Sequence, residues 1–195
     1  MQSLRVKLAL GVAIFSAGAI ATVAVAHDGG SKIRANLTGY EEVPAQSSAA
    51  DARLKAFISR HADEITYTLS YSGPFNTGGT PPAPGAVTQA HIHFGQRHTV
   101  GGIVVWLCQT AGTQAPLAVR DVTPLCPQEG TVTGTIGPAQ VLLVAGQGIA
   151  AGEFEELVRA IRAGATYANV HTEVNTPGEI RGQLRHGGHG HDRHD

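Results

Sequence analysis

Apolar and polar residues alternate along most of the chain after residue 32, as expected for strands with one buried and one exposed face. In the run 65–71, apolar side chains at every second position alternate with threonine and serine. The run 52–59 has the same alternation, and the short polar segment between the two predicts a hairpin. The other segments predicted as strands are 33–38, 87–94, 102–108, 131–136, 141–144, 165–172 and 179–185.

A different period appears near 153–163. Phe154, Leu157, Val158 and Ile161 recur at helical spacing and predict one amphipathic helix. Many short strands with close turns and one inserted helix predict a mainly β chain, folded as an antiparallel β-sandwich or barrel of immunoglobulin-like or superoxide-dismutase-like type. We expect the helix to pack over one opening of this β-structure.

The first residues do not fit this pattern. Arg5 and Lys7 precede a long apolar run that ends in Ala24-Val25-Ala26, the arrangement of a cleaved secretory signal peptide. We therefore expect a secreted or periplasmic protein with no membrane span after cleavage. The predicted parts of the chain are a signal peptide (1–26), a flexible lead-in (27–32), a β-domain (33–185) and a disordered histidine-rich tail (186–195).

Composition narrows the possible partners. Lys and Arg total 14 and Asp and Glu total 15, with no run of basic residues and no aromatic platform, so nothing indicates nucleic acid. Cys108 and Cys126 are expected to form a disulfide in an exported chain, which would stabilise the fold by roughly 3 kcal/mol. Two thiol ligands for a soft metal are the weaker alternative, because an oxidising compartment joins paired thiols.

Histidine is the residue type that most changes this picture. His91 and His93 form a His-x-His motif in a predicted strand, where residues i and i+2 share a face. His171, from a distant predicted strand, could complete a three-histidine site for copper or zinc. The alternative is a buried hydrogen-bonding hub, for which Asn169, Glu179 and Arg181 offer structural partners. The sequence leaves both readings open.

The remaining histidines are weaker candidates. His98 follows the first motif in a loop, and His61 sits in a predicted solvated turn. His27 would become the N-terminal residue after cleavage and could chelate one copper ion. The tail offers a weak transition-metal site that should lose metal below about pH 6. Its histidines are His186, His189, His191 and His194.

Five short motifs, in order, resemble those of the CHRD (chordin-type) domain family. They are Leu37–Pro44 (L-x-G-x-x-E-V-P), Ala90–Gly95 (A-H-I-H-x-G), Gly101–Leu107, Tyr167–Thr172 (Y-x-N-V-H-T) and Pro177–Gln183 (ending in G-E-I-R-G-Q). The resemblance covers roughly residues 33–185. It implies an immunoglobulin-like or related β-sandwich or barrel. The family occurs in chordin, an extracellular binder of secreted growth factors, and implies no settled activity for stand-alone members.

Catalytic signatures are weak. The His-x-His tripeptide is similar to a strand of copper/zinc superoxide dismutases, but the other dismutase motifs are not evident, and there is no Gly-x-Ser-x-Gly elbow. We therefore predict an exported CHRD-type binding module without evident catalytic machinery, with copper or zinc as its candidate cofactor. The alternatives are a copper/zinc metalloenzyme with a three-histidine site, and an extracellular protein-interaction or matrix domain. The partner, a metal or an unknown protein, is not identified by the sequence.

Overall fold

The computed structural model describes residues 29–75 and 86–187. Its strands are β1 (Ser31–Thr38), β2 (Asp51–Ile58), β3 (Ile65–Ser72), β4 (Val87–Phe94), β5 (Gly102–Cys108), β6 (Gly130–Ile136), β7 (Thr166–Thr172), β8 (Ile180–Gln183) and β9 (Arg185–His186). The α-helix is α1 (Phe154–Arg162), and the 3-10 helices are η1 (Gly39–Glu41), η2 (Arg120–Val122), η3 (Pro138–Gln140) and η4 (Ala145–Gln147).

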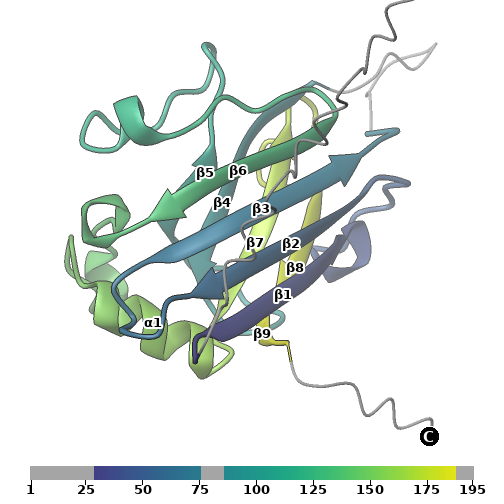
Figure 1. The fold of residues 1–195 in the computed structure, drawn as a ribbon. Coiled ribbons are helices and arrows are strands. Elements are labelled where there is room, and N and C mark those ends of the chain that lie inside the picture. Colours follow the sequence, from purple (N-terminus) through teal and green to yellow (C-terminus); the bar gives the residue numbers. More distant parts are fainter. Residues whose placement is uncertain (1–28, 76–85, 188–195) are drawn as a thin grey trace, which may run out of the picture.

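The strands form one antiparallel sheet that curls into a nearly closed barrel (Figure 1). Its order is β5-β4-β7-β8-β1-β2-β3-β6, and β9 pairs with β1. The predicted hairpin is confirmed, since β2 pairs with β3 along its whole length and Leu54 lies opposite Leu69. The mainly β fold class predicted from the alternation is therefore confirmed.

The barrel interior is filled by the apolar half of the alternating positions. Leu37, Leu54, Leu69, Ile92 and Leu107 come from five different strands and are at most 1% exposed. Each such side chain contributes roughly 1.5–3 kcal/mol by leaving water, so the interior face fixes the register of every strand.

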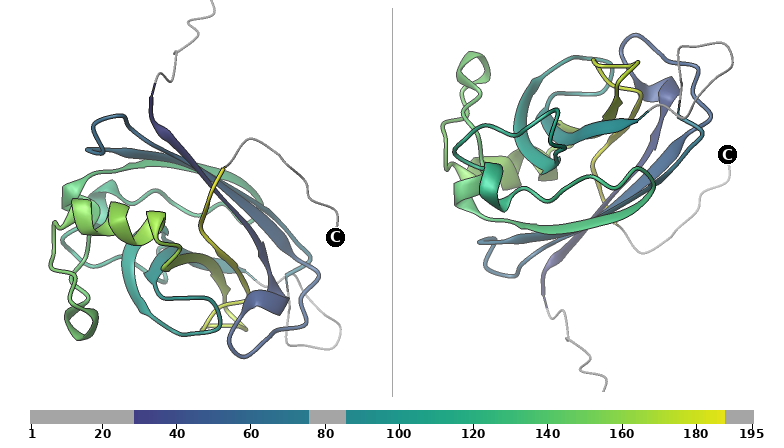
Figure 2. Two further views of the ribbon diagram at one scale, coloured as in Figure 1. Left: turned by 90° about the horizontal axis from the view of Figure 1, so that it is seen from below. Right: turned by 90° about the horizontal axis from the view of Figure 1, so that it is seen from above.

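The predicted helix is confirmed as α1 and lies at one end of the barrel (Figure 2). Phe154, Leu157, Val158 and Ile161 are all buried against the core, as the helical spacing required. Gly164, with φ of +69°, follows the helix in the left-handed conformation that ends many helices. The helix thus covers apolar side chains that a barrel end would otherwise expose.

Three sequence expectations need correction. The predicted flexible lead-in (27–32) is too long, because Ser31 and Lys32 already pair with β2 as the start of β1. Residues 141–143 are not in a strand, and Val144 makes only an isolated bridge to Ile149. The segment runs between η3 and η4, and Leu142 donates one backbone hydrogen bond to the carbonyl of Val104 without continuing as a ladder. At the other end, His186 is not in a tail segment but in β9, where it lies opposite Ile33.

The chain ends are not part of this description. The predicted signal peptide (1–26), and His189, His191 and His194 of the predicted tail, fall outside the described residues. Among the residues that the structure does describe, no helix has the length and apolar character needed to cross a membrane.

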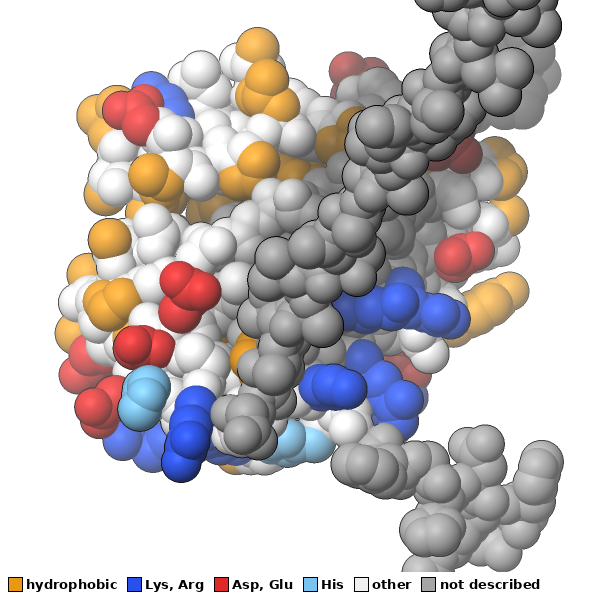
Figure 3. Space-filling model, in the orientation of Figure 1, with side chains coloured by type: hydrophobic (Ala, Val, Ile, Leu, Met, Phe, Trp, Pro, Cys, Tyr) orange, Lys and Arg blue, Asp and Glu red, His pale blue; other side chains and the backbone are white. Residues whose placement is uncertain are grey.

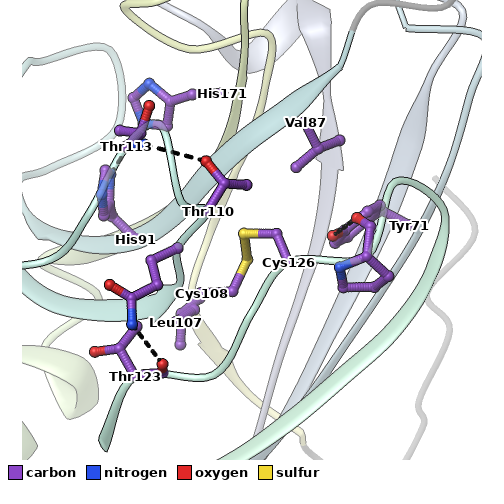
Figure 4. Close-up of a disulfide and its surroundings, with 12 residues drawn as sticks. Tyr71, Val87, His91, Leu107, Cys108, Thr110, Thr113, Thr123, Cys126 and His171 are labelled. Carbon is purple, nitrogen blue, oxygen red and sulfur yellow. Dashed lines mark hydrogen bonds between the residues drawn. A yellow bond between two sulfur atoms is a disulfide. The ribbon is translucent and has the colours of Figure 1, made fainter. Parts of the chain in front are cut away.

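The predicted disulfide joins Cys108, at the end of β5, to Cys126 (Figure 4). It closes a loop that is also organised by the side chain of Gln109. The Gln109 Nε2 donates to the carbonyls of Arg120 and Thr123, both at 2.7 Å, and its Oε1 accepts from the backbone N–H of Ala115. The loop is therefore held to the end of β5.

Replacing both cysteines by alanine should lower the free energy of unfolding by about 3 kcal/mol, because the unfolded chain regains the entropy of the closed loop. Urea denaturation of wild type and the Cys108→Ala/Cys126→Ala variant measures the difference. Wild type in a reducing agent is the matched control and should lose a similar amount. Equal denaturation midpoints for all three samples would contradict the prediction.

Candidate functional site

The three histidines singled out by the sequence come together on the outer face of β4 and β7. On these strands Ile92, Ala168 and Val170 face the barrel core, so the alternate positions face outward. His91 lies opposite Asn169 in the register, and His171 lies opposite Gln89. One ring nitrogen from each of His91, His93 and His171 lies within 4.8 Å of the others. We call these residues the histidine triad.

The triad is buried although it lies outside the barrel interior. The exposed fractions of His91, His93 and His171 are 0%, 8% and 4%. Aromatic rings cover it: the ring of Tyr167 stacks on His93 at a centroid distance of 4.7 Å, and Trp106 packs edge-on against His91 at 4.2 Å. Both faces of β7, and of β4 from Ala90 to His93, are therefore shielded from water.

Backbone carbonyls lie against two of the rings. His93 Nδ1 donates to the carbonyl of Gly101, and His171 Nδ1 faces the carbonyl of Thr176, each at 2.8 Å. Since a carbonyl only accepts, a neutral His93 carries its proton on Nδ1 and its lone pair on Nε2. His171 has a second acceptor, Asn169 Oδ1, 3.0 Å from its Nε2, so its single proton is shared between two acceptors. His93 Nε2 is therefore available as an acceptor or metal ligand.

The third ring completes the pattern. His91 Nδ1 lies 3.1 Å from His171 Nε2, and one of these two nitrogens donates to the other; the two rings, labelled in Figure 4, meet edge-on. His91 Nε2 and His93 Nε2 are both buried with no hydrogen-bond partner. Buried polar atoms are nearly always paired, so these two nitrogens are an exception that needs a physical reason.

Burial also keeps the triad neutral. It lowers the pKa of His93 to about 4, that of His91 well below its ordinary value, and that of His171 below its ordinary value. Neighbouring rings of the triad lower the first two further, since a positive charge on one disfavours a charge on the next. These shifts favour the neutral imidazole, which keeps one N–H and offers its other nitrogen to a metal.

The spacing is slightly wider than a bound ion would need. Zinc–nitrogen bonds of about 2.0–2.1 Å place tetrahedral ligand atoms roughly 3.4 Å apart. The widest pair of ligand atoms, within 4.8 Å of each other, would have to approach by about 1.4 Å to reach that spacing. The three side chains predicted to share a face lie close together and buried.

Glu42 is the neighbouring residue that the sequence reasoning missed. It lies just past η1, buried beside the amide of Asn169, and its Oε1 has no hydrogen-bond partner. Asn169 in turn places its Oδ1 3.0 Å from His171 Nε2. Burial raises the pKa of Glu42 from 4.5 to about 7, although the charge of Arg181 lowers it. The E-V-P motif contains this residue and was the signal available for finding it.

Space at this point is tight enough to require glycine. A Cβ on Gly178 would lie 2.5 Å from Glu42 Oε1 and 2.8 Å from Asn169 Nδ2, and its φ is +134°. Glycine is the residue that tolerates both constraints. Gly178 thus lets the turn after β7 approach the carboxyl of Glu42.

The other predicted structural residues hold the surrounding loops. Glu179 is fully buried and accepts from the hydroxyls of Ser48 and Thr172, both at 2.7 Å, and from Asn175 Nδ2 at 3.0 Å. These bonds join the segment after η1 to the turn after β7.

Arg181, two residues after Glu179, also holds a loop and an aromatic ring in place. It donates to the carbonyl of Gln96, and its guanidinium lies 3.3 Å from the ring centroid of Tyr167. The sequence offered Glu179 and Arg181 as partners of a histidine or of each other. Arg181 instead supports a histidine indirectly, because it holds the ring that stacks on His93.

The weaker histidine candidates lie apart from the triad. His61, His98 and His186 are exposed, as expected for His61. Within the described parts of the chain, the triad is the one group of three or more potential metal ligands found close together. His27 lies outside the described residues.

Replacing Glu42 by glutamine should change how stability depends on pH. A carboxyl whose pKa is raised by folding favours the folded state below pH 4.5, and this contribution is lost as the pH rises to about 7. The Glu42→Gln variant should therefore gain stability relative to wild type across this range, by up to about 3 kcal/mol. Urea denaturation at about pH 4.5, 6 and 8 measures it. A difference that does not change with pH would contradict the assignment.

Comparison with known proteins agrees with the motif analysis. No curated protein and no solved structure matches the chain. The family model of the CHRD domain matches residues 33–184, which include most of β1, all of β2 to β8 and all members of the triad. The chain therefore belongs to the CHRD domain family.

Proposed function

We propose that this CHRD domain is an exported binding module whose histidine triad holds one copper or zinc ion. The observation that carries the proposal is the pair of buried Nε2 atoms, on His91 and His93, that have no hydrogen-bond partner. A hub that serves only to hold strands together would be expected to pair such atoms, because an unpaired buried polar group costs about 1–3 kcal/mol.

The groups around the triad have the arrangement expected of metal ligands. Ligating histidines usually donate their second ring N–H to a carbonyl or carboxylate, which fixes the ring and raises its basicity. His93 does so through the carbonyl of Gly101, and His171 Nδ1 faces the carbonyl of Thr176. Three neutral imidazoles suit zinc and copper better than magnesium or calcium, which prefer oxygen ligands.

A buried cation also needs a compensating negative charge nearby, which Glu42 can supply beside Asn169. Three neutral ligands leave the charge of a divalent ion uncompensated. Glu42, with a pKa of about 7, can lose its proton in response, and Asn169 lies between its carboxyl and His171. A bound copper or zinc ion would supply Lewis acidity, and copper also one-electron chemistry.

The covering of the site favours retention of an ion over turnover of a substrate. Tyr167 and Trp106 lie against two of the three rings, and no triad side chain is more than 8% exposed. Export is supported by the apolar N-terminal run and by the disulfide between Cys108 and Cys126, which is typical of oxidising compartments.

Metal analysis in a background without competing histidines tests the proposal. In this background, His27, His186, His189, His191 and His194 are all replaced by glutamine. Purified protein should hold about one copper or zinc ion per chain, and the added His93→Gln substitution should weaken binding by more than about 100-fold, since it removes a ligand outright. Inductively coupled plasma mass spectrometry and competition with a chromophoric chelator measure both quantities.

His98→Gln is the matched control, because His98 is exposed and lies outside the triad. It should leave the metal content unchanged. Glutamine at position 93 can still donate to the Gly101 carbonyl, and circular dichroism checks that the fold persists. Folded background protein that takes up neither copper nor zinc would refute the metal site and leave the hub.

A further inference from the structure

Five basic side chains that are scattered along the sequence meet on the outer face of β9, β1 and β2. They come from three strands, and all five are exposed. They are Lys32, Arg34, Arg53, Lys55 and Arg185. We call this surface the basic face, and Figure 3 shows part of it as blue side chains over β1 and β2. The chain as a whole has one more acidic than basic residue, so the face is a local concentration of charge.

The pairing register puts like charges directly beside one another. Arg34 lies opposite Arg185 on one side and opposite Lys55 on the other. Neighbouring strands are about 4.8 Å apart, and like charges in directly opposite positions destabilise a sheet. Among the described residues, the salt bridges involve only Arg97 and Arg159, so none relieves this row. A surface that costs stability in this way indicates a function.

On β3 and β6, the positions that pair in register with the cations of the basic face carry hydroxyl side chains. Lys55 is followed in register by Thr68 and Thr133, and Arg53 by Ser70 and Thr131. These side chains are partly or fully exposed. A shallow groove of about 570 Å³ runs along this junction, with Arg53 and Lys55 on one side and Thr68, Ser70 and Thr131 on the other.

Two further hollows extend this groove. One shares Lys55 and Thr68 with it and reaches Lys32, and the other shares Asn36 and reaches Arg34 and Arg185. The acidic residues at the borders are Asp51, at the start of β2, and Glu41, which is paired with Arg97. Cations and hydroxyls thus line one continuous surface.

We propose that the basic face binds an extended anionic polysaccharide, with its carboxylate or sulfate groups on the cations and its hydroxyls on the threonine and serine rows. The complementarity has two parts, since the row of cations attracts the charges and the hydroxyl rows can both donate and accept hydrogen bonds. The large exposed apolar side chains among the described residues, such as Leu117, Leu125 and Leu143, lie outside these strands, which disfavours insertion into a lipid surface. Single-stranded nucleic acid binds by stacking its bases on exposed aromatic rings. Among the residues that line these hollows, Phe57 is the one aromatic residue that is not fully buried, so the surface does not favour such a partner.

Alginate oligosaccharides of defined length serve as the probe, measured by isothermal titration calorimetry on the full mature chain. Binding should weaken about tenfold or more when sodium chloride rises from about 50 to 200 mM, because counterions are released from both surfaces. The Arg34→Gln/Lys55→Gln variant should weaken binding by about tenfold or more and flatten the salt dependence, since it removes two of the contacting cations.

The matched control is Arg159→Gln/Arg162→Gln, which removes the same charge from α1 and should bind as wild type does. Thr68→Val should weaken binding several-fold without changing the salt dependence, because it removes a hydroxyl and no charge. Circular dichroism confirms that each variant folds, and Arg34→Gln/Lys55→Gln should melt no lower than wild type because it relieves repulsion.

Several results would overturn the proposal. One is no binding of alginate at low salt, and another is equal affinity for neutral dextran. Equal weakening by the basic-face and α1 variants would show that only net charge matters. Tighter binding of a single-stranded DNA oligonucleotide, or of phosphatidylglycerol vesicles, would assign the face to that partner instead.

Discussion

The register between β4 and β7 is the constraint on which the candidate site depends. Both strands bury apolar residues such as Ile92 and Val170 in the barrel, and both bury polar residues on their other face. A slip of one residue would drive His91 and His93 into the core and expose apolar side chains, which makes the pairing strongly specified. The triad thus takes its geometry from the hydrophobic core, although no member of it belongs to that core.

The polar outer face of β4 and β7 is buried because short loops pack over it. The carbonyls of Gly101 and Thr176 form hydrogen bonds with His93 and His171, and Glu179 joins the turn after β7 to Ser48. Among the described residues five buried side-chain atoms have no hydrogen-bond partner, and three of them are the nitrogens of His91 and His93 and an oxygen of Glu42. These three atoms lie around Asn169 and the triad, where a cation and its counter-charge would be placed together.

Much of this arrangement could be predicted from the sequence. Alternation gave the hairpin of β2 and β3, helical spacing gave α1, and i, i+2 spacing put His91 and His93 on one face. Residues 141–144 do not form the predicted strand, since a short apolar run can be an extended connection as well as a strand. Glu42 was missed because its approach to Asn169 depends on the path of the chain after η1, which no periodic pattern in the sequence encodes. The basic face could not be predicted from the sequence, because only strand pairing brings Arg34, Lys55 and Arg185 together.

The separation of 80 positions between His91 and His171 has a consequence for how the proposed site would acquire its ion. Neither strand alone offers three ligands, so a high-affinity site exists only once β4 and β7 have paired. A chain that crosses a membrane unfolded carries no such site during transport. Its choice between copper and zinc would then be made by the metal supply of the compartment in which it folds, and not by that of the compartment in which it was made.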